Sequence, residues 1–226
     1  MKKNIATQYN DFHSLYSENF ADDKISRDAF HGAINFNLSD KKILDVGCGD
    51  GKDLVILSKN STSVFGIDPS MEFLKKAQIN NPLGVFKEAV GENIPFEDKT
   101  FDVVISKWAI QTSTDVPKVL LEMARVLKKD GILVFLSKHP VLQFLQKSRD
   151  YGPGVDYYQQ QIVTSSIYSG KIRVKEPSHT IGEYFNMDFF RNFEMIDYKE
   201  GTDFPASAQI NGDIYPTFFV VKARRK

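Results

Sequence analysis

The stretch ILDVGCGDGKDL, residues 43–54, places a cluster of glycines directly after an apolar run and directly before a helical pattern. The run KILDV predicts a strand, and KDLVILSK predicts the helix that follows it. A tight turn needs one glycine, but this junction has three: Gly47, Gly49 and Gly51. Glycine lets a ligand approach the main chain closely, and the start of a helix offers unpaired N–H groups. The stretch therefore predicts a ligand-binding turn.

Two common phosphate-binding patterns do not fit this turn. A P-loop needs Ser or Thr after its lysine, but Asp53 follows Lys52. A dinucleotide fingerprint needs its third glycine at the position of Lys52. Asp45, at the entrance of the turn, would repel a pyrophosphate and attract an ammonium group. We therefore expect a ligand with a positively charged end.

Composition excludes several classes of partner. Among the 226 residues, Lys and Arg total 29 and so do Asp and Glu, so we expect no nucleic-acid partner. The basic stretch KARRK at the end is interpreted as a solvated chain end. A lone cysteine, Cys48, indicates a reducing compartment, and the apolar runs are too short to span a bilayer. We expect a cytoplasmic protein without a membrane partner or a metal site, while the oligomeric state stays open.

The rest of the chain alternates strand and helix patterns. Runs such as DVVIS and ILVFL suit strands that are buried on both faces of a sheet. Residues 115–131 predict one of the helices, with Asp115 as its cap and Gly131 at its end. Residues 215–224, YPTFFVVKAR, predict the last strand. This alternation predicts the α/β class with a doubly wound sheet.

We expect a single domain, residues 1–226, in four parts. They are an N-terminal helical cap, a ligand-binding core, a small β insertion and a C-terminal part with a helix and strands, at residues 1–40, 41–149, 150–178 and 179–226. Thr180 and Glu183 form a capping-box pattern at the start of the late helix. The cap and the insertion are expected to cover the carboxyl edge of the sheet, where open α/β folds bind ligands.

Four motifs occur in order between residues 40 and 140: LDVGCGDG, FGIDPS, ENIPFEDKTFDVVIS and RVLKKDGILVFLSKHP. With these motifs the sequence resembles the class I S-adenosylmethionine-dependent methyltransferases. The resemblance implies a Rossmann-like, seven-stranded, mostly parallel sheet with helices on both faces. It also implies S-adenosylmethionine as cofactor and S-adenosylhomocysteine as product.

The same resemblance implies a set of residues that contact the cofactor: Tyr16, Asp45, Gly47, Cys48, Gly49, Asp68, Pro69, Met71, Gly91, Glu92 and Ser106. In it, Asp45 orients donors near the ammonium group, Asp68 binds the ribose hydroxyls, and Met71 lies over the adenine. In many relatives an acidic residue that contacts the adenine amino group occupies the position of Val90. The main-chain N–H of Gly91, with Glu92 beside it, is expected to contact adenine N1, and Glu88 is the candidate substitute for the contact with the amino group.

Several of these residues have a structural alternative. For Asp45 the alternative is a carboxylate that caps the helix or orders the loop. Cys48 is a small residue that fits beside the glycines, and Met71 and Tyr16 suit ordinary packing. The sequence alone leaves these alternatives open.

Methyl transfer from a sulfonium is an in-line displacement, so the protein mainly aligns the reactants, and a base is needed only if the acceptor loses a proton. Trp108, the only tryptophan, follows a predicted strand and is expected to face the acceptor or the sulfonium. His139 is the candidate base and His179 a candidate acceptor contact. Packing is the alternative for Trp108, and a structural loop position is the alternative for each histidine.

Three functions are compatible with these patterns. The first is a methyltransferase that acts on a small-molecule acceptor, since no docking module or basic face stands out in the sequence. The second is a non-catalytic module that keeps the fold for cofactor binding or assembly. The third, an NAD-dependent oxidoreductase, conflicts with Lys52 in the glycine turn. Oxygen, nitrogen and carbon acceptors all remain open.

Overall fold

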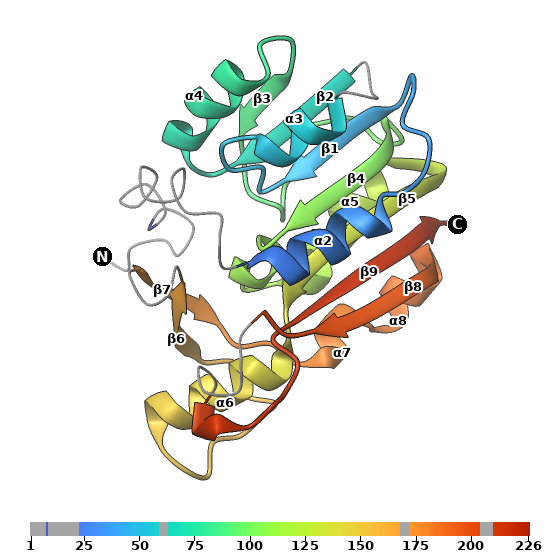
Figure 1. Cartoon of the computed structure of the whole chain (residues 1–226). Helices are drawn as coiled ribbons and strands as arrows, with labels where there is room; N and C mark the ends of the chain where they lie inside the picture. Colours follow the sequence, from blue (N-terminus) through green and yellow to red (C-terminus); the bar gives the residue numbers. More distant parts are fainter. Residues whose placement is uncertain (1–7, 9–22, 59–62, 168–171, 204–209) are drawn as a thin grey trace.

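The computed structural model describes residues 8, 23–58, 63–167, 172–203 and 210–226. Its centre is a seven-stranded sheet with the order β3-β2-β1-β4-β5-β9-β8. The first five strands along the chain run parallel, and β9 pairs antiparallel with both β5 and β8. Figure 1 shows the parallel strands pointing with their carboxyl ends toward the same edge. The predicted seven-stranded, mostly parallel, doubly wound sheet is confirmed.

The strands of this sheet have the following bounds: β1 Lys42–Val46, β2 Ser63–Asp68, β3 Val85–Glu88, β4 Phe101–Lys107, β5 Leu127–Lys138, β8 Phe193–Gly201 and β9 Phe218–Arg225. Strands β1, β4 and β5 are buried along most of their length because helices cover the sheet on both sides. This agrees with the continuous apolar runs that the sequence shows there.

Helices cover the two faces in separate groups. On one face lie α2 (Lys24–Ala33), α3 (Lys52–Ser58) and α4 (Met71–Asn80), and on the other lie α5 (Val116–Val126), α7 (Ile181–Tyr184) and α8 (Met187–Asn192). Phe30 of α2 and Leu54 of α3 are fully buried in the first core, and Met123 of α5 is fully buried in the second. Within the described residues, no helix is long and apolar enough to cross a bilayer.

Local capping follows the sequence closely. The Asp115 carboxylate accepts from the N–H of Lys118 at the start of α5, as expected. Thr180 and Glu183 form the predicted capping box, although the expected single late helix is divided into α7 and α8. The prediction that α5 extends to Gly131 is wrong, because Leu127 already pairs with Phe101 in the sheet.

Two elements lie near the predicted acceptor region, a helix and the predicted β insertion. The SKHP stretch, expected to be a loop, leads directly into α6 (Pro140–Tyr151), which ends at a glycine with positive φ, Gly152. The predicted β insertion exists as the antiparallel hairpin of β6 (Ile162–Ile167) and β7 (Ile172–Pro177). Figure 1 shows this hairpin beyond the carboxyl ends of the sheet, with α6 packed against it.

A buried ion pair joins the hairpin to the sheet. The Lys138 ammonium, at the end of β5, contacts the carboxylate of Glu176 in β7 and the hydroxyl of Ser165 in β6. Ser165 in turn donates to Glu176 Oε1 at 2.7 Å. Lys138 is 8% exposed and Glu176 is 1% exposed, so water does not screen their attraction. The pair fixes the hairpin at this edge.

Part of the predicted N-terminal cap lies outside the described residues, and this includes Tyr16. Within the described part, α2 packs on β9 and β5. The Gln8 side chain forms two hydrogen bonds with the main chain of Lys175 in β7, at 2.7 and 2.8 Å. Gln8 therefore contacts the hairpin.

Breaking the buried pair from one side should destabilise the protein strongly. Glu176→Gln leaves the Lys138 ammonium buried without its counter-charge, and we expect the free energy of unfolding to fall by about 3–5 kcal/mol. The double variant Lys138→Met/Glu176→Leu removes both charges and should lose much less. Urea denaturation of both variants measures this difference. Equal stability of the single and the double variant would contradict the interpretation.

Candidate functional site

The glycine turn lies at the point where the sheet reverses its direction of growth. From β1 the chain proceeds outward through β2 and β3, and then returns to place β4 and β5 on the other side of β1. Asp45 pairs with Gly66 on one side and with Ile105 on the other. Because open α/β sheets bind ligands at the carboxyl ends of the strands at such a point, the site is expected here.

All three glycines of the turn have left-handed backbone conformations, with φ of 79°, 51° and 73° for Gly47, Gly49 and Gly51. Glycine adopts this region without the steric cost that a Cβ brings. A Cβ on Gly47 would lie 2.2 Å from the Cβ of Ala109, so this position is also closed by packing. A Cβ on Gly49 would meet no atom within 4 Å. Gly49 therefore faces open space, which a ligand can occupy.

The N–H groups of the turn are used inside the protein. Gly47 and Cys48 both donate to the Ile67 carbonyl, at 2.8 and 3.0 Å, and Gly51 donates to the Cys48 carbonyl at 2.9 Å. Gly49 donates to Asp68 Oδ2 at 3.0 Å. These four N–H groups order the turn and are not free, whereas contact of a ligand with the N–H groups at the start of α3 stays a prediction. What the turn offers a ligand is acceptor oxygens.

Asp45 is the most exceptional group of the site. Its side chain is 3% exposed, and its Oδ1 atom is buried with no hydrogen-bond partner within the described residues. Burial raises the pKa of this carboxyl well above its usual range, the Asp53 charge adds to the shift, and Lys107 opposes it. A buried carboxylate oxygen without a donor is costly. The arrangement is therefore suited to a ligand that brings a donor or a positive charge.

Asp68 closes the other side of the turn. Its two carboxylate oxygens accept from the main-chain N–H groups of Gly49 and Ser70, at 3.0 and 2.8 Å. Burial raises its pKa to about 6, although these two hydrogen bonds act in the opposite direction. Ser70 caps α4 through its hydroxyl, which accepts from the Phe73 N–H. Each Asp68 oxygen keeps acceptor capacity for a further donor.

Three other predicted cofactor residues lie around the turn in supporting positions. The Cys48 thiol is buried, and burial raises its pKa well above the usual value, so it stays protonated. A Cβ on Gly66 would lie 2.7 Å from its sulfur, which agrees with a small residue packed beside glycines. Ser106 donates to the Val46 carbonyl at 2.8 Å and ties the ends of β4 and β1 together. Pro69 lies directly between Asp68 and the cap of α4.

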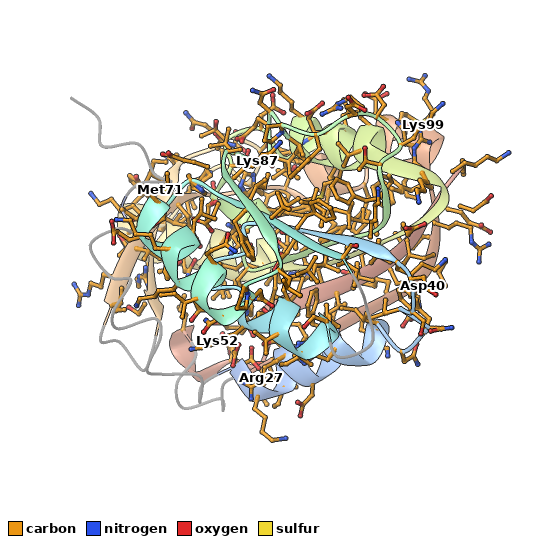
Figure 2. All side chains as sticks on the ribbon, turned by 90° about the horizontal axis from the view of Figure 1, so that it is seen from above. Arg27, Asp40, Lys52, Met71, Lys87 and Lys99 are labelled. Carbon is orange, nitrogen blue, oxygen red and sulfur yellow. The ribbon has the colours of Figure 1, made fainter. Side chains whose placement is uncertain are left out.

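The predicted adenine side lies further out. Met71 is the first residue of α4 and is 48% exposed. Figure 2 shows it at this terminus of the helix, near the surface. Gly91 packs closely on α5, because a Cβ there would lie 2.9 Å from Val119 Cγ1. The Glu92 carboxylate accepts from the Ser113 hydroxyl. Contact of these residues with the cofactor stays a prediction.

Trp108 directly follows β4 in a strained conformation, with φ of 57°. Its main-chain N–H donates to the Leu136 carbonyl at 3.0 Å, and its main-chain carbonyl accepts from Gln111 Nε2 at 2.7 Å. The indole packs edge-on against Phe218, with ring centroids 6.4 Å apart. A bulky residue with positive φ is costly and is often found at functional sites. The packing role that the sequence left open for Trp108 is therefore present in the structure. Its contact with an acceptor stays a prediction.

Both predicted histidines have two hydrogen-bonded ring nitrogens. His139 Nδ1 accepts from the Val141 N–H at 3.1 Å, and Nε2 lies 3.0 Å from Glu200 Oε1. Burial lowers the pKa of His139, and Glu200 opposes this shift. A role for His139 as base requires one of these bonds to open.

His179 lies closer to the loop that carries Trp108. Its Nε2 is 3.1 Å from the Gln111 carbonyl, and its Nδ1 is 3.3 Å from Glu183 Oε2. Gln111 also accepts from the Ser137 hydroxyl at 3.2 Å, and Ser137 contacts the Tyr184 hydroxyl at 2.8 Å. The result is a buried polar network beside the carboxyl edge. The sequence showed no periodicity or motif that pointed to Gln111 or Ser137.

A second charged cluster lies next to Asp45 and was also missed. Lys107, at the end of β4, is 2.8 Å from Asp53 Oδ2, and His31 Nε2 of α2 is 2.8 Å from Asp53 Oδ1. Asp53 was noted only as the residue that excludes a P-loop. Its position in the first turn of α3 brings the N-terminal helix, β4 and the glycine turn together.

Comparison with known proteins identifies the family. The family described as Methyltransferase domain matches residues 44–135. The chain is 31% identical over 178 residues to the ubiquinone/menaquinone biosynthesis C-methyltransferase UbiE of Campylobacter jejuni, covering 71% of this chain and 73% of that protein. The chain is a class I S-adenosylmethionine-dependent methyltransferase. Its cofactor is S-adenosylmethionine, as the four motifs imply.

Two further comparisons agree with this assignment. The methyltransferase is 29% identical over 153 residues to the phthiotriol/phenolphthiotriol dimycocerosates methyltransferase 1 of Mycobacterium ulcerans, covering 66% of this chain and 55% of that protein. The crystal structure of an S-adenosylmethionine-dependent methyltransferase from Mesorhizobium loti has the same fold, with a TM-score of 0.70 at 21% identity. It covers 91% of this chain and 99% of that chain.

The residues at the turn fit this cofactor. S-adenosylmethionine carries an ammonium group, and the buried Oδ1 of Asp45 lacks a donor. The open space beside Gly49 leaves room for the ligand against the main chain. Asp68 ends β2 with remaining acceptor capacity for ribose hydroxyls.

Filling the space beside Gly49 should separate binding from folding. Gly49→Ala introduces a Cβ that meets no protein atom, at a cost of about 1–2 kcal/mol for the left-handed backbone. We expect the variant to fold but to bind S-adenosylhomocysteine at least about tenfold more weakly in calorimetry. Gly47→Ala, which clashes with Ala109, is the matched variant that should lose stability as well. Undiminished binding by Gly49→Ala would show that the ligand lies elsewhere.

The raised pKa of Asp68 predicts opposite pH dependences for binding and for stability. Below about pH 6 the folded protein holds a proton on Asp68, so affinity for S-adenosylhomocysteine should rise as pH increases from about 5 to about 7. Because the folded pKa lies above the unfolded value, the contribution of Asp68 to the stability of the ligand-free protein should fall over the same range. Calorimetry and thermal unfolding measure the two trends. An unchanged pH profile in Asp68→Asn would assign them to another group.

Proposed function

We propose that this methyltransferase transfers the methyl group to a small-molecule acceptor by in-line displacement at the carboxyl edge of the sheet. The observation that carries the proposal is the buried, unpartnered Oδ1 of Asp45 beside the open space at Gly49. A site that presents acceptor oxygens at low exposure favours the cationic end of the cofactor over a phosphate.

When bound, S-adenosylmethionine supplies a methyl group on a positively charged sulfur, which is also the leaving group. The Asp45 carboxylate holds the ammonium end, and the Asp68 carboxylate accepts from the ribose hydroxyls. These contacts fix the donor relative to the sheet edge. Alignment of the two reactants in a site from which water is excluded contributes on the order of 7–11 kcal/mol to such reactions.

The acceptor is proposed to lie between the loop after β4 and the β6–β7 hairpin. Strand β7 contacts the 3-10 turn Ile110–Thr112, and His179 connects the two through the Gln111 carbonyl. Trp108, held by Leu136 and Gln111, provides a rigid wall on the sheet side. His179 is proposed to contact the acceptor through a rearranged hydrogen bond.

A small acceptor is supported by the relatives, whose names refer to quinone biosynthesis and to phthiotriol dimycocerosates. The similarity to a C-methyltransferase supports a carbon atom as the methyl acceptor. Both ring nitrogens of His139 are engaged, so the structure favours an acceptor that is already nucleophilic at neutral pH. His139 acts as base only if its bond to Glu200 opens.

We also propose that the chain works as one methyltransferase domain in the cytoplasm, without a nucleic-acid or membrane partner. In this proposal the core, residues 41–149, binds the cofactor, and residues 150–178 cover the acceptor. The anchoring of the hairpin by Lys138 and Glu176 supports the assignment of a cover.

Isotopically labelled S-adenosylmethionine tests the proposed reaction directly. Incubated with the enzyme and a metabolite extract, it should transfer label to a small-molecule product, and Gly49→Ala should transfer at least about tenfold less. NAD⁺ should show no binding in calorimetry, because Lys52 replaces the third dinucleotide glycine. Label in a protein or nucleic-acid fraction would overturn the small-molecule assignment. Tight cofactor binding with no label transfer to any fraction would favour the non-catalytic alternative.

A further inference from the structure

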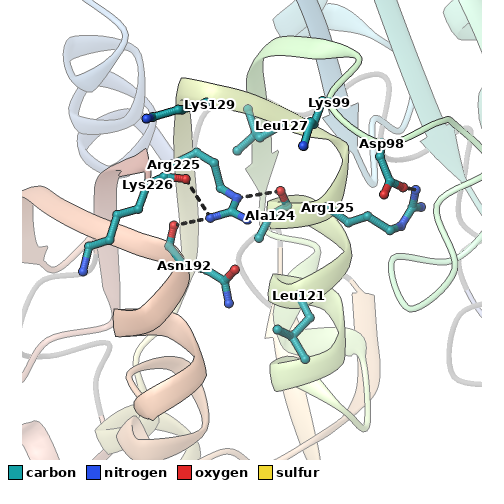
Figure 3. A pocket seen from close by; sticks show the side chains of 10 residues that line it. All are labelled: Asp98, Lys99, Leu121, Ala124, Arg125, Leu127, Lys129, Asn192, Arg225 and Lys226. Atoms are coloured by element: carbon teal, nitrogen blue, oxygen red, sulfur yellow. Dashed lines mark hydrogen bonds and ion pairs between the residues drawn. The ribbon is translucent and has the colours of Figure 1, made fainter.

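A cavity of about 400 Å³ opens at the amino-terminal edge of the sheet, opposite the glycine turn. It lies between the end of α5, the start of β5, the end of α8 and the end of β9 (Figure 3). Its lining includes a single carboxylate, that of Asp98. It also includes five cationic side chains, which are Lys99, Arg125, Lys129, Arg225 and Lys226.

The two arginines that line this cavity are both held by hydrogen bonds. Arg125 is held by the carboxylates of Glu122 and Asp98, at distances of 2.7 and 2.8 Å. Arg225 donates to the carbonyls of Ala124 and Asn192, at 2.9 and 3.0 Å, and Figure 3 shows its guanidinium between them. Arg225 also donates to the main-chain oxygen of Lys226 at 3.0 Å. Within the described residues no side-chain carboxylate pairs with Arg225, and a planar guanidinium in fixed orientation is well suited to bind an anion.

The carboxyl end of α5 does not account for the cationic side chains that line the cavity. A helix carboxyl end attracts positive charge through its free carbonyls. Here the Arg125 carbonyl accepts from the Lys99 N–H at 2.9 Å, and the Val126 carbonyl accepts from the Thr100 N–H at 2.8 Å. The Ala124 carbonyl accepts from Arg225. The helix end is therefore satisfied largely by the main chain and one arginine.

Lys99 and Lys129 line the cavity as exposed residues from two different segments of the chain. Neither ammonium group has a hydrogen bond or an ion pair with any of the described residues, and both side chains line the same cavity. The charges converge from separate segments on one concavity and do not form a stripe along the surface. Convergence favours a compact anion over an extended chain of phosphates.

We propose that this cavity is a second binding site, for a phosphate or pyrophosphate group that is carried either free or on a nucleotide. Arg225 and the two free lysines provide the charge, and the Lys226 ammonium, now bonded to the Phe190 carbonyl, lies at the rim. The volume exceeds that of one phosphate and suits a pyrophosphate or a nucleotide. No lining residue belongs to the glycine turn, so this site goes beyond the proposed methyl transfer.

Calorimetry with inorganic pyrophosphate tests the proposal on the whole chain. Wild type should bind, and Lys99→Ala/Lys129→Ala should bind at least about tenfold more weakly. The matched control is Lys24→Ala/Lys199→Ala, which removes two lysines with side chains that are 74% and 54% exposed outside the cavity. It should bind pyrophosphate as wild type does. Asp98→Asn, which removes the only lining carboxylate, should bind more tightly.

Each other outcome has a defined consequence. Binding of a nucleoside triphosphate tighter than that of pyrophosphate would assign the site to a nucleotide, and equal affinity would assign it to the phosphate group alone. Binding only of single-stranded oligonucleotides would overturn the proposal in favour of a nucleic-acid surface. Equal pyrophosphate affinity of the two double variants would also overturn it. Unchanged S-adenosylhomocysteine binding in Lys99→Ala/Lys129→Ala shows that the variant is folded and that this result is separate from the proposed function.

Discussion

A carboxylate that is buried without a hydrogen-bond donor constrains the whole carboxyl edge of this enzyme. Asp45 lies in β1, an interior strand of the sheet, and its Oδ1 atom has no partner among the described residues. Such a group is tolerated only where the surrounding structure is stable enough to hold it. Two well-packed faces of the sheet provide this stability. The site is therefore prepared for a cation before the ligand arrives.

The glycine turn serves this carboxylate in a way that differs from phosphate-binding turns. Its N–H groups bond to Ile67, Cys48 and Asp68 inside the protein. A phosphate would need those donors, whereas an ammonium group needs acceptors. The same left-handed glycines therefore serve opposite ligand chemistries in different folds, depending on where the donors of the turn point.

Charge in this protein is distributed unevenly in space although it balances in total. The carboxyl edge has the acidic groups Asp45, Asp53 and Asp68, and the amino edge has a cavity with five cationic side chains. The composition, with 29 residues of each sign, predicted no nucleic-acid partner. Totals average over the surface, so a local excess of charge becomes visible only when the fold brings distant segments together.

The sequence by itself determined the α/β class, the cofactor and the position of the turn, because these depend on short local patterns. Strand runs, the caps at Asp115, Thr180 and Ser70, and the glycine spacing are all encoded within a few neighbouring residues. The tertiary structure alone decided that His139 caps a helix, that Gln111 holds Trp108, and that the basic cavity exists. These features join residues far apart in the chain, and no local pattern encodes the distance between two side chains that meet only after folding.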